Sequence, residues 1–146
     1  MRVLGIDYGL RRTGIAIGDT PAHGGGGMAL PFEVFEGLAN PALAQAIAQL
    51  VRKEAIEAVV VGLPLNADGS ISGQSQLTER FILALQQALG TGPGTVPIHR
   101  ISEYLSTHDV EGKLAGHFTR LQKRARVDAL AAARILQDWM DGASPV

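Results

Sequence analysis

Two short apolar runs at the start of the chain, separated by a polar turn, predict a β-hairpin. Val3–Ile6 and Gly14–Ile17 are short runs of strand-forming residues, and a basic turn that contains glycine separates them. A third strand is expected over Leu30–Phe35. The segment before it contains Pro21 and the glycines Gly24–Gly27, which favour neither helix nor strand and therefore predict a flexible loop.

Helical spacing begins after this third strand. Apolar residues between Leu43 and Val51 recur at intervals of three and four positions, which predicts a helix from Asn40 to about Glu54. Asn40 is the expected N-cap, because Pro41 suits the first helical position.

The next elements alternate between strand and helix. The uncharged run Ala58–Gly62 is typical of a parallel strand that is covered on both faces, and Pro64 is expected to end it. A helix over Gln74–Leu89 and a strand over Val96–Ile101 should follow.

The last part of the chain is predicted to be helical. Ser106 or Thr107 can cap a short helix, and apolar spacing predicts a final helix over Val127–Asp141. A helix between two strands normally makes them parallel. The order β-β-β-α-β-α-β-α-α therefore predicts an α/β fold over residues 1–146 as a single domain. Its five-stranded mixed sheet would have three antiparallel strands followed by parallel strands, with helices on its faces.

Composition narrows the classes of protein that fit this pattern. The chain has 146 residues, of which 46% are hydrophobic, enough for one ordinary core. The absence of cysteine excludes disulfides, thiolate nucleophiles and cysteine zinc sites, and the four histidines lack close metal-binding spacing. The N-terminus lacks the pattern of a signal peptide, and no apolar run is long enough to cross a bilayer. We therefore expect a cytoplasmic protein that does not contact membranes.

Charge is balanced over the chain but unevenly distributed. The formal net charge is −1, so the overall composition does not indicate a nucleic-acid binder. Cations are concentrated at two places: Arg11 and Arg12 in the hairpin turn, and Lys123, Arg124 and Arg126 within the run from 120 to 126. Such a run is either a solvated face or a set of phosphate contacts.

Three carboxylates are expected to meet at one edge of the sheet. Asp7 ends the first strand, Glu103 follows the fifth, and Asp128 lies in the first turn of the final helix. Parallel strands place their carboxyl ends at a common edge, where ligands bind, whereas Asp19 should emerge at the opposite edge. Three converging acids repel one another unless cations are bound, and ligand sets made only of oxygen favour Mg²⁺ or Mn²⁺. Capping of the hairpin turn is the alternative role for Asp7.

Four motifs together resemble those of the YqgF/RuvX family. They are Asp7-x-Gly9-x-Arg11-x-x-Gly14, Val61-Gly62-Leu63-Pro64-Leu65-Asn66-x-Asp68-Gly69, Glu103-x-Leu105-Ser106-Thr107 and Val127-Asp128-x-x-Ala131. The resemblance covers nearly the whole chain and implies an RNase H-like fold. It also implies a nuclease of pre-16S ribosomal RNA or a Holliday-junction resolvase. The chain departs from the usual family pattern beside Glu103, where Ser102 and Tyr104 replace an Asp and an Arg.

The resemblance assigns roles to these residues. Asp7, Glu103 and Asp128 would be the catalytic and metal-binding carboxylates of a two-metal-ion hydrolysis of phosphodiester bonds. The expected nucleic-acid contacts are Arg11, Arg12, Asn66, Lys123, Arg124 and Arg126. For Asn66, a turn that satisfies its own hydrogen bonds is the alternative. The substrate would be an RNA precursor or branched DNA, and the oligomeric state, a homodimer included, is left open.

Two other classes of protein stay open at this point. A nucleic-acid-binding module could carry the same acids for structural reasons and have no activity. An actin-like or sugar-kinase-type phosphotransferase shares the Asp-x-Gly hairpin, but it needs a second lobe for which 146 residues leave no room.

Overall fold

A five-stranded mixed sheet with helices on both faces forms the fold. The structure is a computed structural model that describes residues 1–21, 27–90, 92–104 and 120–142, with only the backbone described at position 104 and over 120–128. The strands are β1 (Arg2–Asp7), β2 (Arg12–Asp19), β3 (Met28–Glu36), β4 (Ala58–Leu65) and β5 (Ile98–Tyr104), in the order β3-β2-β1-β4-β5. The helices are α1 (Asn40–Lys53), α2 (Gly73–Leu89) and α4 (Arg120–Met140).

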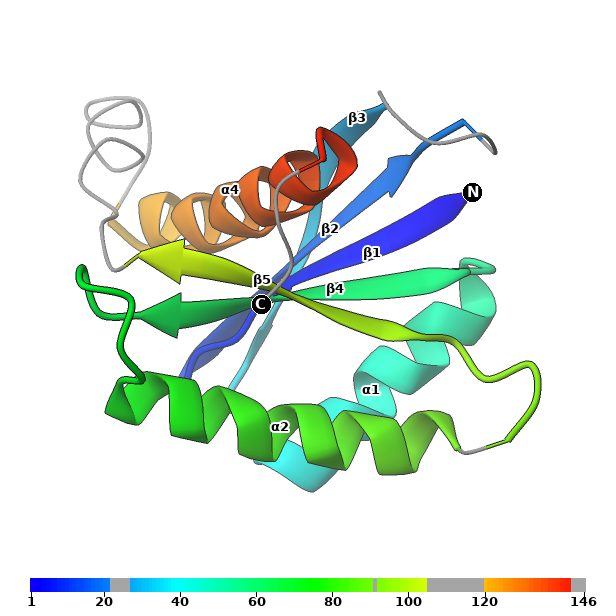
Figure 1. Ribbon diagram of the computed structural model, residues 1–146, viewed down its shortest axis with the longest axis horizontal. Helices are drawn as coiled ribbons and strands as arrows, with labels where there is room; N and C mark the ends of the chain where they lie inside the picture. The colour runs from blue at the N-terminus through cyan, green and yellow to red at the C-terminus, as the bar shows by residue number, and fades with distance from the viewer. Residues whose placement is uncertain (22–26, 91, 105–119, 143–146) are drawn as a thin grey trace.

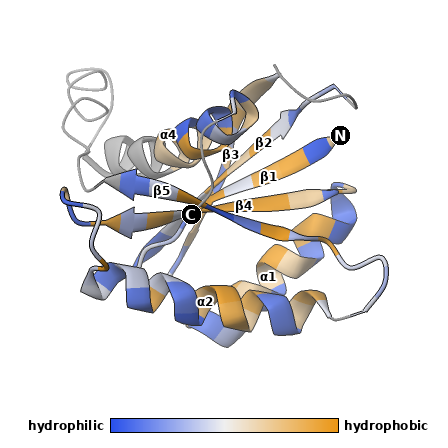
Figure 2. Ribbon diagram, viewed as in Figure 1, coloured by the Kyte–Doolittle hydropathy of each residue, from blue (hydrophilic) through white to orange (hydrophobic). Residues whose placement is uncertain are grey.

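The helices divide the core into two layers (Figure 1). Helices α1 and α2 cover one face of the sheet, where Ile6, Ile47 and Phe81 belong to one buried cluster. Helix α4 lies across the other face, where Val60 and Leu136 belong to the second cluster. Figure 2 shows that apolar residues are concentrated in the central strands, as expected for strands covered on both sides.

The strand directions confirm the predicted topology. Strands β1 and β2 are antiparallel with Asp7 opposite Gly14, and β1 and β4 are parallel with Ile6 beside Val61. Asp19 is opposite Arg2, so it lies at the other edge of the sheet from Asp7, as predicted.

Strand β4 is longer than the sequence predicts, because Pro64 does not end it. The amide of Val59 donates to Pro97 on the β5 side, so by alternation the amide position of Pro64 faces the β1 side. Pairing of β1 with β4 stops at Val61. A missing N–H at position 64 therefore costs no ladder bond, and β4 continues to Leu65. The extension gives β5 a partner as far as position 104, which explains why β5 ends later than predicted.

The start of α1 corrects a further prediction. Ala39, not Asn40, is the N-cap of α1, and Asn40 Oδ1 instead accepts a hydrogen bond from the hydroxyl of Tyr8 at 2.8 Å. Helix α2 begins with a capping box in which Ser72 and Ser75 bond each other's backbone amides. Both hydroxyls also donate to the carbonyl of Pro64, which β1 leaves unpaired.

Helix α4 begins at Arg120, seven residues before the predicted Val127. The basic run from 120 to 126 is therefore part of the helix and not a separate segment. Arg, Lys, Gln, Leu and Ala all have high helix propensity, so their charge does not prevent helix formation. The short helix expected at Ser106 or Thr107 lies outside the described residues, as does most of the glycine loop.

Glycine allows α4 to lie directly on the sheet. A Cβ added at Gly5 would lie 2.6 Å from Cβ of Leu136 and 2.9 Å from the carbonyl oxygen of Ala132. One at Gly18 would lie 3.1 Å from Cε of Met140. These contacts fix which turn of the helix lies over which strand residue.

We expect Gly5→Ala to destabilise the fold by about 1–3 kcal/mol, because the added methyl would meet helix backbone that cannot move without shifting α4. Urea unfolding measures the change. Gly73→Ala is the control, since nothing lies within 4 Å of a Cβ at this first residue of α2. Alanine there should cause no loss, or a gain of up to about 1 kcal/mol. Equal effects of the two substitutions would contradict the close packing of α4.

Candidate functional site

Asp7 and Glu103 lie on the same face of the sheet, at its carboxyl edge. Side chains alternate along a strand, so Asp7 shares a face with Gly5, which α4 covers. Glu103 shares a face with Ile101, which is buried in the cluster under α4. Both acids therefore face the layer that α4 occupies, and both are half-buried.

The register of α4 brings Asp128 to the same edge. Met140 lies over Gly18 near the start of β1, and Leu136 and Ala132 lie over Gly5. Helix α4 therefore runs antiparallel to β1, and its N-terminal end lies toward Asp7. Asp128 is one turn before Ala132, at the end of the helix that extends toward Asp7. Its side chain is outside the described part of the structure.

The carboxylate of Glu103 has a partly desolvated environment. Burial, with a smaller contribution from Asp138, raises its pKa above the usual value, and Arg134 opposes that rise. Gly62 leaves the space beside this acid, because a Cβ there would lie 3.3 Å from Cγ of Glu103 and 2.5 Å from Cδ1 of Ile135. A larger residue at position 62 would fill the gap between the acid and the helix.

The oxygen donors and the partial burial of this site suit a divalent cation. Asp7 and Glu103 offer oxygen atoms only, which Mg²⁺ and Mn²⁺ prefer. A half-buried acid gains from a cation that replaces its lost hydration. Among the side chains that the structure describes, no three His, Cys, Asp or Glu residues are grouped closely enough to hold a metal. A third ligand would have to come from a residue such as Asp128.

The basic residues predicted to contact nucleic acid fall into two groups. Arg11 is exposed in the hairpin turn, whereas Arg12 is paired, with its Nε 2.7 Å from Oε1 of Glu36. Lys123, Arg124 and Arg126 lie in the first two turns of α4, next to Asp128 in sequence. Only their backbone positions are described.

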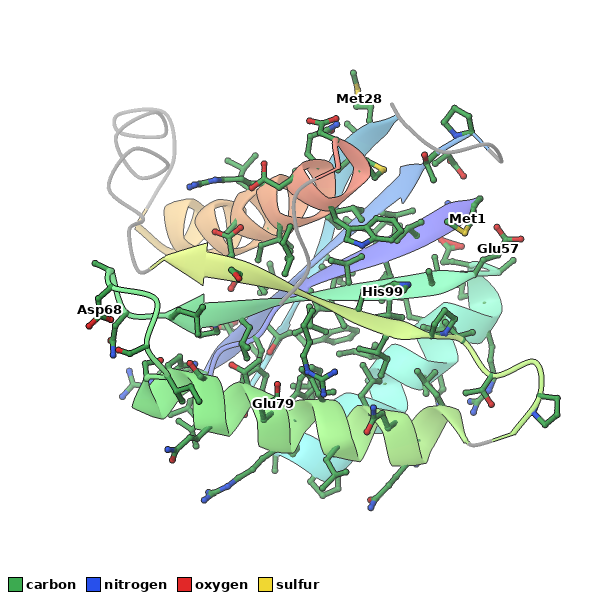
Figure 3. The ribbon with its side chains drawn as sticks, viewed as in Figure 1. Met1, Met28, Glu57, Asp68, Glu79 and His99 are labelled. Carbon is green, nitrogen blue, oxygen red and sulfur yellow. The ribbon has the colours of Figure 1, made fainter. Side chains whose placement is uncertain are left out.

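Asn66 belongs to a turn that satisfies its own hydrogen bonds, the alternative that the sequence left open. Its Nδ2 donates to Oγ of Ser70 at 3.0 Å, and its backbone amide donates to the carbonyl of Ser70. Asp68 accepts from both the amide and the hydroxyl of Ser70, and these bonds lower its pKa. Figure 3 shows Asp68 at the outer tip of the loop that follows β4. The polar groups of this turn are thus used to shape the loop.

The sequence did not predict a role for the pair Arg134 and Asp138 or for Tyr8. Arg134 and Asp138 act on Glu103 from α4, and their spacing of four residues is a signal that they share one side of the helix. Tyr8 is buried directly after Asp7, with its ring stacked on Phe81 at a centroid distance of 4.6 Å. Its hydroxyl bond to Asn40 anchors the start of the hairpin turn to α1.

Similarity to solved structures identifies the class of fold. The chain is similar to RuvC of Thermus thermophilus, with a TM-score of 0.54 and 18% identity over the whole of both chains. It is also similar to the Fowlpox virus resolvase solved with Holliday junction DNA, with a TM-score of 0.56 and 7% identity over 97% of each chain. At these identities the likeness concerns the fold alone, which is RNase H-like, as the sequence motifs implied.

Sequence comparison then identifies the family. Residues 1–142 match the RuvX family, which is described as Holliday junction resolvase. A protein of Anaeromyxobacter sp. (strain Fw109-5) is 38% identical over 143 residues, which cover 97% of this chain and 98% of that protein. One of Azotobacter vinelandii is 36% identical over 139 residues, or 94% and 92% of the two chains. Both bear the name "Putative pre-16S rRNA nuclease". The chain belongs to the RuvX family.

Within the described part of the chain, no helix has the length and apolar character that a membrane span requires.

The raised pKa of Glu103 predicts a pH-dependent stability in the absence of metal. A folded pKa above the unfolded value means that the native state binds more protons in that interval, so stability is greatest on the acid side. We expect the melting temperature in EDTA to fall as the pH rises from about 4.5 to about 8 through the folded pKa, and Glu103→Gln to reduce that fall.

Glu33→Gln is the matched control, because Glu33 is an exposed acid on β3. It should leave the pH profile of the melting temperature unchanged. If the Glu103 and Glu33 variants have the same profile, the environment of Glu103 is not the one described above.

Proposed function

We propose that this chain is a metal-dependent endonuclease that hydrolyses phosphodiester bonds in structured nucleic acid. Processing of pre-16S ribosomal RNA is the proposed activity, and branched DNA of the Holliday-junction type is the second substrate class. The observation that carries this proposal is that Asp7 and Glu103 share one face of the sheet at its carboxyl edge in a chain of the RuvX family. Ligands bind at this edge in open α/β sheets.

The proposed metal ligands are Asp7, Glu103 and Asp128. Two bound Mg²⁺ or Mn²⁺ ions would supply an activated water and neutralise charge on the phosphoryl oxygens. The carboxylates would stay ionised and act as ligands, not as general bases. The burial that raises the pKa of Glu103 partly covers this side of the site. Ile135, over Gly62, supplies part of that apolar cover.

The proposed substrate contacts are cationic and hold phosphates without reading sequence. Arg11 is exposed in the hairpin turn three residues after Tyr8, and Lys123, Arg124 and Arg126 precede Asp128 on α4. Arg12 is a weaker candidate, since Glu36 already pairs its charge.

Support for the substrate classes comes from different comparisons. The names of the curated relatives favour the RNA precursor. The family description and the Holliday junction complexes of RuvC and the viral resolvase favour branched DNA. The rival function is a nucleic-acid-binding module without activity. It would bind in EDTA and cleave nothing in any metal.

We expect Asp7→Asn to lower the rate of hydrolysis by at least about 100-fold while the fold is kept. Loss of a metal ligand should exceed the roughly 10- to 100-fold cost typical of outer-shell partners. Labelled RNA hairpins from a 16S precursor, single-stranded DNA and four-way junctions would be incubated with the protein in Mn²⁺, and initial rates compared.

Asp19→Asn is the control for this variant, because Asp19 ends β2 at the opposite edge of the sheet. It should cleave at the wild-type rate. A wild type that cleaves none of the three substrates would refute the proposed function. A fully active Asp7→Asn would remove Asp7 from the site.

Replacement of Lys123, Arg124 and Arg126 by Ala should weaken binding with little effect on the rate at saturating substrate. Each lost phosphate contact should reduce the slope of log K against log[salt] by about 0.7 to 0.9. Lys53→Ala with Arg80→Ala is the control, since both are exposed on the helices that cover the other face. An unchanged slope in the α4 variant would mean that its basic run is only a solvated face.

A further inference from the structure

A cavity lies beside the hairpin turn that follows Asp7. It is a shallow depression, open to solvent over most of its extent, with a volume of about 560 Å³. One wall is the turn from Leu10 to Arg12, and the other is the segment from Glu36 to Ala39 between β3 and α1. Of the proposed metal ligands, Asp7 and Glu103, whose side chains the structure describes, do not line it, so the cavity extends beyond the site formed by these two acids.

Both walls of the cavity are held in place by polar contacts. The amide of Gly37 donates to the carbonyl of Arg11 at 3.1 Å, and Arg12 pairs with Glu36, its cross-strand partner on β3. The hydrogen bond from Tyr8 to Asn40 joins the residues that flank these two segments. A ligand would therefore meet a largely preformed surface and would not have to order these segments.

The lining combines apolar surface with one available cation. Leu10 is 65% exposed and Leu38 is 38% exposed, although both are large apolar residues. The exposed Arg11 forms no ion pair with any residue of the described structure, in contrast to Arg12. The pair of Arg12 and Glu36 adds a donor and an acceptor at the cavity wall.

We propose that this cavity binds one unpaired nucleotide of the substrate strand, with the base against Leu10 and Leu38 and its phosphate on Arg11. The assignment of nucleic acid as the ligand rests on the proposed function. A nucleotide is the unit of that substrate that has both an apolar face and a negative charge, and removing the apolar face of any base from water against leucine side chains is favourable. A paired base cannot enter, because its faces are covered by its neighbours in the duplex.

The position of the cavity gives the bound nucleotide a role in placing the strand. Leu10 is only three residues after Asp7, so their backbones are at most about 10 Å apart. A nucleotide held there would be close to the bond that is cut. The enzyme would therefore favour cleavage beside an unpaired position, such as the end of a helix or a branch point.

The test compares two single-stranded DNAs of the same length and charge, one with all its bases and one wholly abasic. Affinities would be measured by fluorescence anisotropy in EDTA, where hydrolysis does not occur. We expect the wild type to prefer the strand with bases, and Leu10→Ala with Leu38→Ala to reduce that preference about fivefold, as expected for the loss of a small apolar contact area. Leu83→Ala is the control, because Leu83 is 58% exposed on α2 and does not line the cavity.

Arg11→Gln should weaken the binding of both strands and reduce the salt slope by about 0.7, as expected for one phosphate contact. The proposal is overturned if the wild type binds neither strand, if it does not prefer bases, or if the Leu10 and Leu38 variant keeps the wild-type preference. An unchanged salt slope for Arg11→Gln would exclude the phosphate from this cavity.

Cleavage assays in Mn²⁺ keep this proposal separate from the nuclease proposal. Cleavage by a protein whose base preference does not depend on Leu10 and Leu38 would refute the cavity alone. A base preference that depends on these leucines in a protein that cleaves nothing would refute the nuclease alone.

Discussion

Direct contact between α4 and the glycines of the sheet is the constraint on which the rest of the structure depends. Gly5, Gly18 and Gly62 lie on three neighbouring strands, and α4 packs closely on each. A Cβ at Gly5 would meet the backbone of α4, one at Gly62 would meet the side chain of Ile135, and one at Gly18 would lie 3.1 Å from Cε of Met140. Interiors are packed closely enough that even one added methyl is felt. The glycines therefore set both the height of the helix above the sheet and its position along the strands. That position brings the N-terminal part of α4, with Asp128, toward the edge where Asp7 and Glu103 lie.

The same contact sets the electrostatics of the site. A helix this close to the sheet removes water from around Glu103, which raises its pKa, and it brings Arg134 and Asp138 within range of that acid. Burial alone would make the carboxylate costly to ionise. A divalent cation would offset that cost, so under the proposed function the packing that stabilises the fold would also favour metal binding. Stability without metal and affinity for metal would then be opposed in this part of the molecule.

Much of this arrangement follows from the sequence because strand alternation and strand direction are local rules. They predict that Asp7 and Glu103 end strands at one edge and that Asp19 ends at the other. These rules fail where a segment distant in the sequence determines the end of an element or the contacts of a side chain. Pro64 does not stop β4 because β1 has already ended beside it, which nothing near Pro64 in the sequence indicates. The influence of Arg134 on Glu103 could not be predicted without knowing the register of α4 on the sheet. That register depends in part on Gly5 and Gly18, which lie more than a hundred residues before Arg134 in the sequence.

The junction between β4 and α2 allows the loop between them to change in length and sequence. Ser72 and Ser75 both donate to the carbonyl of Pro64, so the end of the strand is fastened directly to the start of the helix. Asn66 and Ser70, in the loop between them, are hydrogen-bonded to each other, and the loop from Asn66 to Ile71 is mostly exposed. Insertions in such exposed tips cost little. Evolution can therefore exchange or lengthen this turn separately from the rest of the fold and change what approaches the carboxyl edge of the sheet, while Asp7 and Glu103 stay where they are.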